Sequence, residues 1–187
     1  MKAFGHTRAT RLDEADALVE LDIPTPEPGP RDVVVEISAV SVNPVDTKLR
    51  SIAPPNGESR VLGYDAVGTV VATGGQVRGF RAGDRVFYAG SSLRQGSNAR
   101  FQAVDERLIA RAPESLTDEE AAALPLTALT AWELLFDRLG LRAGEMESPD
   151  ALLIVGGAGG VGSILTQIAR RLTGLEVIVT ASRPETV

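Results

Sequence analysis

ALLIVGGAGGVG, at residues 151–162, joins an apolar run to a cluster of glycines. The run at 151–155 contains no polar residue, which is typical of a strand covered on both faces in a parallel sheet. Apolar residues then recur at helical spacing over 161–172, and Gly174 follows as a stop signal. A second strand is predicted at 176–181. The segment therefore predicts a strand–turn–helix–strand unit whose two strands run parallel.

The glycines of this turn fit the pattern G-x-G-x-x-G, which becomes informative where a strand ends and a helix begins. The early glycines permit a tight turn and close approach of a pyrophosphate, and Gly162 permits close packing of the helix on the strand. The helix N-terminus offers unpaired amides and a partial positive charge to phosphates. We therefore predict a dinucleotide site; the alternative is a turn that merely connects strand and helix. The predicted cofactor-binding residues are Gly157, Gly159, Gly160, Val161 and Gly162.

The end of the second strand indicates which dinucleotide binds. An NAD site usually has an acidic residue there, which accepts hydrogen bonds from the ribose hydroxyls. Glu176 has a suitable sequence spacing, but it opens the strand and would lie about 16 Å from the carboxyl end, at about 3.3 Å per residue. At that end stand Ser182 and Arg183, a hydroxyl and a guanidinium that suit a 2′-phosphate. We expect NADP(H) rather than NAD; the alternative is that Arg183 is a solvated turn residue.

The first two-thirds of the chain predicts short strands separated by glycine and proline turns, which suggests a barrel or sandwich. These strands are expected at 17–23, 32–37, 66–72, 84–88 and 98–104. The pattern then changes, because Thr117–Glu120 is a capping box that opens a helix. Another helix is expected from Ala128 to a stop at Gly140. We place the domain boundary between residues 1–123 and 124–187.

Composition excludes several classes of function. The 187 residues include 19 Lys and Arg against 25 Asp and Glu, and the net charge of −6 argues against nucleic acid as a partner. The chain has no cysteine and one histidine, His6, so disulfides, thiolate nucleophiles and sites with Cys or paired His ligands are excluded. No apolar run approaches the roughly 20 residues of a membrane span, and the N-terminus lacks the apolar core of a secretion signal. We expect no membrane partner and a cytoplasmic location.

Several stretches together resemble the medium-chain dehydrogenases/reductases, and within them the zinc-free quinone oxidoreductases similar to zeta-crystallin. Besides the glycine turn, they are Val42–Asp46, Gly63–Gly68, Gly83–Val86 and Ala121–Ala131. The resemblance implies an α/β protein with an all-β N-terminal part. Residues 1–123 would form a GroES-like β-barrel that carries the substrate and catalytic groups. Residues 124–187 would form the first βαβ unit of a Rossmann dinucleotide-binding domain.

The resemblance also implies that the catalytic zinc ion is absent. In zinc-dependent members of this superfamily, a cysteine lies in the stretch that corresponds to Ser41–Asp46, and a histidine follows the glycine that matches Gly63. Here the first stretch has no cysteine and position 64 is tyrosine. Serine and tyrosine are poor substitutes for thiolate and imidazole around zinc.

By resemblance, the chemistry is NADPH-dependent, metal-free hydride transfer to a quinone or an α,β-unsaturated carbonyl, a small electrophilic substrate. The resemblance assigns Asn43 and Asp46 as catalytic residues, in a cleft between the domains, and places Thr130 near the cofactor. Asn43 could orient the nicotinamide carboxamide or donate to a developing enolate oxygen. Alternatively, Asn43 starts a turn and Asp46 caps a short helix at 47–50. Many relatives have a tyrosine where this chain has Lys48, so a tyrosine-assisted role is not carried over.

Only two strands of a dinucleotide fold that usually has six are visible, so we expect a truncated form of a longer protein. Two parallel strands and their helices would leave apolar surface exposed, which predicts poor solubility or association, including a possible homo-oligomer. The alternatives to an oxidoreductase are an NADP(H)-binding sensor and an inactive truncated remnant without turnover.

Overall fold

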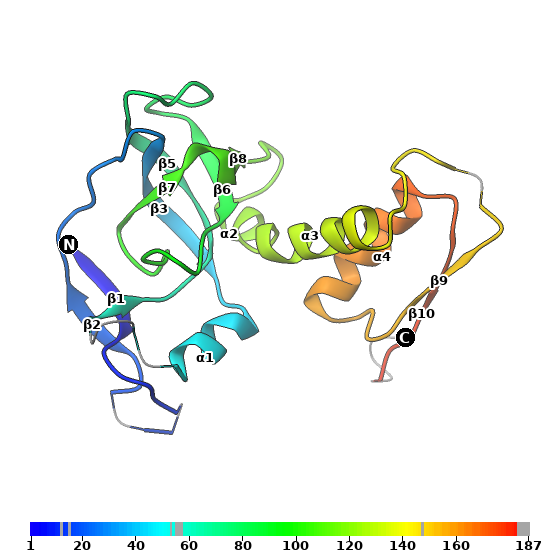
Figure 1. The fold of residues 1–187 in the computed structure, drawn as a ribbon, viewed down its shortest axis with the longest axis horizontal. Helices are drawn as coiled ribbons and strands as arrows, with labels where there is room; N and C mark the ends of the chain where they lie inside the picture. Colours follow the sequence, from blue (N-terminus) through cyan, green and yellow to red (C-terminus); the bar gives the residue numbers. More distant parts are fainter. Residues whose placement is uncertain (12, 15, 53, 55–57, 147, 183–187) are drawn as a thin grey trace. The chain divides into compact units, whose positions relative to one another are not determined.

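The computed structural model describes the chain except for residues 12, 15, 53, 55–57, 147 and 183–187. The chain forms two compact units, Met1–Pro125 and Leu126–Val187 (Figure 1). The boundary expected from the sequence lies two residues earlier. Within the described ranges, no helix is both long and apolar enough to cross a bilayer.

The first unit contains two antiparallel sheets. The larger has the strand order β7-β3-β5-β6-β8 and the smaller has the order β2-β1-β4. The bounds are β1 (Lys2–His6), β2 (Val19–Asp22), β3 (Asp32–Ser41), β4 (Arg60–Val61), β5 (Asp65–Thr73), β6 (Arg85–Ala89), β7 (Phe101–Asp105) and β8 (Ile109–Arg111). The long pairing of β3 with β5 runs from Val33 opposite Thr73 to Ser41 opposite Asp65. This register places two polar residues side by side where β3 ends and β5 begins.

The core of the first unit is formed by alternate residues of the larger sheet, as the period-two pattern of a strand requires. Its buried members are Val33, Val35, Ala66, Val70, Val86, Tyr88 and Val104. Tyr88 lies inside this core, and its phenol donates to Gln102 Oε1 at 2.9 Å. Burial raises the pKa of Tyr88. His6 is also fully buried.

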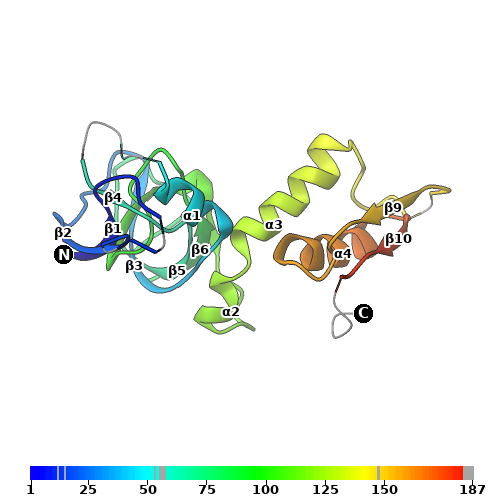
Figure 2. The ribbon, with the colours of Figure 1, turned by 90° about the horizontal axis from the view of Figure 1, so that it is seen from below.

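Two short helices belong to this unit. α1 (Pro44–Arg50) follows β3 directly (Figure 2), with Asn43 as its N-cap. It begins three residues earlier than the sequence suggested, because proline is compatible with the first helical turn. α2 (Asp118–Ala122) has the predicted capping box. Thr117 Oγ1 accepts from the Glu120 amide at 3.3 Å, and Glu120 Oε2 accepts from the Thr117 amide at 3.0 Å.

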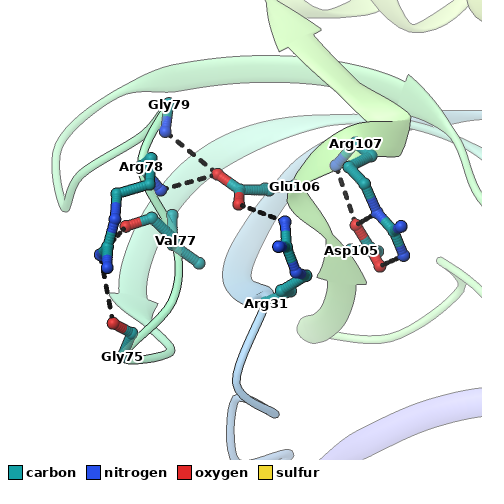
Figure 3. Close-up of polar contacts among 8 residues, drawn as sticks. All are labelled: Arg31, Gly75, Val77, Arg78, Gly79, Asp105, Glu106 and Arg107. Atoms are coloured by element: carbon teal, nitrogen blue, oxygen red, sulfur yellow. Dashed lines mark hydrogen bonds and ion pairs between the residues drawn. The ribbon is translucent and has the colours of Figure 1, made fainter.

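A carboxylate ties down the loop between β5 and β6 (Figure 3). Glu106 opens the short helix η2 (Glu106–Leu108), and its Oε2 accepts from the amides of Arg78 at 2.8 Å and Gly79 at 3.0 Å. Its other oxygen lies 3.8 Å from the Arg31 guanidinium. The two amide hydrogen bonds, with Arg31 in support, hold the pKa of Glu106 below its usual range. This loop is therefore fixed by a charge that is lost in acid.

The second unit contains the predicted strand–turn–helix–strand arrangement. Its elements are α3 (Pro125–Trp132), the π-helical segment η3 (Glu133–Arg138), β9 (Ala151–Ile154), α4 (Gly160–Leu172) and β10 (Glu176–Val179). β9 and β10 pair in parallel, with Ala151 opposite Glu176 and Ile154 opposite Val179. The helix through α3 and η3 stops at Gly140, whose φ of +69° suits glycine. This confirms the stop predicted from the sequence.

Helices cover only one face of the β9–β10 pair among the described residues. The covered face packs in a cluster with the buried residues Ala131, Leu135, Ile154, Leu165 and Ala169. On the other face Leu153 is 60% exposed and Ile178 is 47% exposed. The apolar exposure expected from the sequence is thus present, and it is concentrated on this face.

Candidate functional site

The glycine turn between β9 and α4 packs its backbone against its neighbours. Gly156 has a φ of +75°, a backbone conformation that residues with a side chain rarely adopt. A Cβ on Gly157 would lie 1.9 Å from Val179 Cγ1. A Cβ on Gly162 would lie 2.4 Å from the Gly156 carbonyl oxygen and 2.7 Å from Gly157 Cα. Gly162 thus allows the close approach of helix and strand that the sequence predicted.

The N-terminus of α4 presents unpaired amides. Its N-cap is Gly159, which has no side chain to occupy the helix end. The first backbone bond of the helix runs from the Ser163 amide to the Gly159 carbonyl, at 2.9 Å. Within the described part of the chain, the amides of Gly160, Val161 and Gly162 donate to no acceptor. Three such donors at the positive end of a 13-residue helix suit a phosphate group.

Thr180 holds this turn to the end of β10. The Gly156 amide donates to Thr180 Oγ1 at 3.1 Å, and the Gly157 amide donates to the Thr180 carbonyl at 2.9 Å. The Thr180 amide in turn donates to the Ile154 carbonyl at 2.9 Å. Thr180 was not among the residues predicted from the sequence. The signal for it was a hydroxyl residue at the carboxyl end of the second strand, beside the turn.

The strand register decides the position of Glu176. Glu176 pairs with Ala151 at the start of β9, whereas Val179 pairs with Ile154 beside the turn. Glu176 therefore lies at the end of β10 away from the glycines, as predicted from the sequence. Ser182, beyond β10, is exposed, and Arg183 lies outside the described residues.

Thr130 lies on α3 in the same unit. Its side chain is exposed, and its hydroxyl donates to the Leu126 carbonyl at 2.7 Å. Thr127, one turn earlier, approaches the start of α4, because a Cβ on Gly160 would lie 3.4 Å from Thr127 Cγ2. With its proton engaged inside the helix, Thr130 retains lone pairs as acceptors. Its assignment as a cofactor contact stays a prediction.

Asp46, in the first unit, is buried and has both carboxylate oxygens engaged. Oδ2 accepts from the Asn43 amide at 2.8 Å, and Oδ1 accepts from the Gly63 amide at 3.0 Å. The first bond belongs to the capping box of α1, which is the helix-capping alternative raised from the sequence. The second bond ties α1 to the start of the next motif. A catalytic role for Asp46 stays a prediction.

Asn43 points its amide nitrogen at a buried carboxylate. Its Nδ2 donates to Asp65 Oδ2 at 2.8 Å, and Ser41 Oγ donates to the same oxygen at 3.0 Å. Asn43 is 7% exposed and Asp65 is fully buried. Asp65 was missed as a functional candidate, although it lies in the stretch Gly63–Gly68 that carried the family resemblance. The structure thus brings Asn43 and Asp46 into one polar network.

Comparison with known proteins agrees with this architecture. Residues 29–114 match the alcohol dehydrogenase GroES-like domain. A zinc-type alcohol dehydrogenase-like protein of Staphylococcus epidermidis (strain ATCC 12228 / FDA PCI 1200) is 48% identical over all of this chain and 55% of its own length. A 2-methylene-furan-3-one reductase of Solanum lycopersicum is 36% identical over 97% of this chain and 47% of its own length. The chain spans about half the length of the curated relatives it matches.

Solved structures show the same fold. A mycobacterial quinone oxidoreductase superposes with a TM-score of 0.79 at 35% identity, over 100% of this chain and 54% of its own. A mycobacterial protein complexed with NADPH gives the same values. These matches confirm the expected fold class, a GroES-like barrel followed by the first strand–helix–strand unit of a Rossmann domain.

The donor set of this chain does not fit the zinc ion named for some relatives. The chain has no cysteine and one histidine, and the described residues include no group of three His, Cys, Asp or Glu side chains able to hold a metal. Tyr64 follows Gly63, where zinc-dependent members carry histidine. Burial raises the pKa of the Tyr64 phenol, which disfavours the anionic form that a metal would need.

Proposed function

The chain belongs to the medium-chain dehydrogenase/reductase family, and from that premise we propose an NADPH-dependent, metal-free oxidoreductase that reduces a quinone or an α,β-unsaturated carbonyl compound. The observation that carries the proposal is the row of unpaired amides at the start of α4, on a turn fixed by Thr180. Two similarities support it: one solved relative is complexed with NADPH, and one curated relative is named for reducing a conjugated methylene ketone.

The residues of the second unit fit a dinucleotide. The amides of Gly160, Val161 and Gly162 would bind the diphosphate, and the missing side chain at Gly159 leaves room for it. Beyond β10, Ser182 and Arg183 would bind a 2′-phosphate, and this is the reason we propose NADP(H) rather than NAD. When bound, the reduced nicotinamide supplies a hydride, which adds to the electrophilic carbon or the quinone and leaves NADP⁺.

The first unit would supply position and polarity to the reacting groups. Asn43 is the proposed contact with nicotinamide or substrate, and Asp46 is a positioning residue, because its oxygens hold the Asn43 and Gly63 amides. With both oxygens of Asp46 engaged, we assign the proton that completes the reduction to water. That proton goes to the α-carbon of an enone or to the quinone oxygen.

The test has a binding arm and a turnover arm. Calorimetric titration of the chain should show NADPH binding, weaker NADH binding, and competition by inorganic pyrophosphate. Absorbance at the reduced-nicotinamide band should then fall when quinones or enones are added. NADPH binding without oxidation by any acceptor would favour a sensor. Absence of NADPH binding would refute both functions.

A further inference from the structure

Asp65 determines which way the Asn43 amide faces. An ionised carboxylate can only accept hydrogen bonds, whereas an amide carries donors on its nitrogen and lone pairs on its oxygen. Asp65 is fully buried, and its Oδ2 receives Ser41 Oγ at 3.0 Å and Asn43 Nδ2 at 2.8 Å. Because Oδ2 already accepts from the Ser41 hydroxyl, the reverse orientation would turn Asn43 Oδ1 toward an acceptor, with lone pairs facing lone pairs. The need for a donor at this position therefore determines that Nδ2 of Asn43, and not Oδ1, faces Asp65.

The second N–H of the same amide also faces inward. Asn43 Nδ2 lies 3.4 Å from Ser41 Oγ, so both of its hydrogens are directed at acceptors within the protein. At the helix end, the Asp46 amide donates to the Asn43 backbone carbonyl at 2.9 Å, and the Asn43 side chain makes no capping hydrogen bond. An amide oxygen has two lone pairs, so Oδ1 remains an acceptor for a ligand.

We propose that Asp65 is a positioning residue that makes Asn43 a hydrogen-bond acceptor toward its ligand. The group that Asn43 recognises must then be an N–H or O–H donor, and the carboxamide NH₂ of the reduced nicotinamide has this chemistry. Donation from Asn43 to an enolate oxygen, the other role suggested by the sequence, is incompatible with this orientation. The inference rests on the proposed function, because it requires that NADPH binds.

The experiment compares NADPH with its reduced 3-acetylpyridine analogue, in which a methyl group replaces the carboxamide NH₂. Wild-type chain should bind NADPH roughly tenfold more tightly than the analogue, the scale of one hydrogen bond. In Asp65→Asn, an isosteric change, the new amide can donate to Asn43 Oδ1 and release the Asn43 NH₂ toward the ligand. The tenfold preference should then fall to about one.

The matched control is Ser97→Ala. Ser97 Oγ donates to the backbone carbonyl of Asp65 at 3.1 Å, so this change removes a buried hydrogen bond from the same residue without touching its carboxylate. Its preference for NADPH should remain tenfold. A second variant, Asn43→Ser, keeps a residue type that is favoured at helix N-caps but removes the amide oxygen, so it should also lose the preference. It provides the test if Asp65→Asn does not fold.

The outcomes are separable. Equal binding of the two cofactors by wild-type chain, or a preference that persists in Asp65→Asn or in Asn43→Ser, overturns the role of Asp65 and Asn43 while leaving NADPH binding intact. Failure of wild-type chain to bind NADPH at all refutes the proposed function, and this inference with it. If Ser97→Ala also lost the preference, the change in preference would reflect general destabilisation rather than the orientation of Asn43. That result also overturns the proposal.

Discussion

Gly162 shows how a single hydrogen atom in place of a side chain shapes the nucleotide site. Its α-carbon faces the Gly156 carbonyl so closely that any Cβ would collide with the backbone. Backbone cannot rotate away as a side chain can, so a larger residue must displace α4 from β9. The amides at the start of α4 would move with the helix.

Gly162→Ala should therefore cost about 1–3 kcal/mol of stability and weaken NADPH binding at least tenfold. Chemical denaturation followed by Trp132 fluorescence reports on the second unit, because Trp132 packs 4.6 Å from the Phe136 ring centroid. Gly75→Ala is the matched control, since a Cβ there meets no atom within 4 Å. Unchanged stability and binding in Gly162→Ala would show that the turn has more room than its geometry indicates.

Arg183 tests the choice of cofactor. Arg183→Ala should weaken NADPH binding by about 1.5–3 kcal/mol, the scale of a hydrogen bond to a charged group, and should spare NADH, which lacks the 2′-phosphate. Arg170→Ala, an exposed change in the last turn of α4, serves as the control for net charge. Calorimetry with both cofactors measures the effect, and equal losses for NADPH and NADH would contradict the assignment.

At the scale of elements, the loop between β5 and β6 depends on one carboxylate. Glu106 accepts two amide hydrogen bonds, and its pKa is lowered in the folded chain relative to about 4.3 when unfolded. A lowered folded pKa means that the charge stabilises the fold above the unfolded pKa. This contribution disappears as pH falls through the folded pKa.

Glu106→Gln should consequently destabilise the loop at pH 7, and the difference from wild type should shrink as the pH falls through the lowered pKa of the folded residue, where the wild-type carboxylate also becomes neutral. Hydrogen-exchange protection factors of the β5 and β6 amides, compared at pH 7 and at an acidic pH, measure this difference in stability. Glu114→Gln, at an exposed carboxylate, should change little at either pH. If the loss of protection in Glu106→Gln were the same at both pH values, the packing of the side chain rather than its charge would hold the loop.

At the scale of the whole molecule, the β9–β10 pair has an apolar face that no helix of the described residues covers. Leu153 and Ile178 lie on this face, and both are largely exposed. Exposed apolar patches drive association, so we expect the apparent mass of the chain to rise with concentration. The double change Leu153→Lys and Ile178→Lys should keep the chain monomeric in sedimentation velocity. Leu93→Lys, at a 93% exposed position in the first unit, should leave the association unchanged, and a monomeric Leu93→Lys would place the contact elsewhere.

Local patterns in the sequence predicted a large part of this protein. The glycine turn, α4, the capping box at Thr117 and the stop at Gly140 all follow from interactions between residues a few positions apart, and β9 and β10 each follow from a local apolar run. Such interactions leave a periodic or positional trace, because backbone geometry repeats every two or 3.6 residues. Composition by itself likewise excludes thiolate chemistry, because the chain has no cysteine.

Tertiary structure alone decided the rest. The short strands β1, β4 and β8 are held by pairing rather than by their own pattern. The bond from Asn43 to Asp65 joins residues 22 positions apart, and the register of β3 on β5 brings them together. The partner of a polar side chain in a remote strand leaves no trace in local sequence, because it depends on which strands pair and in which register.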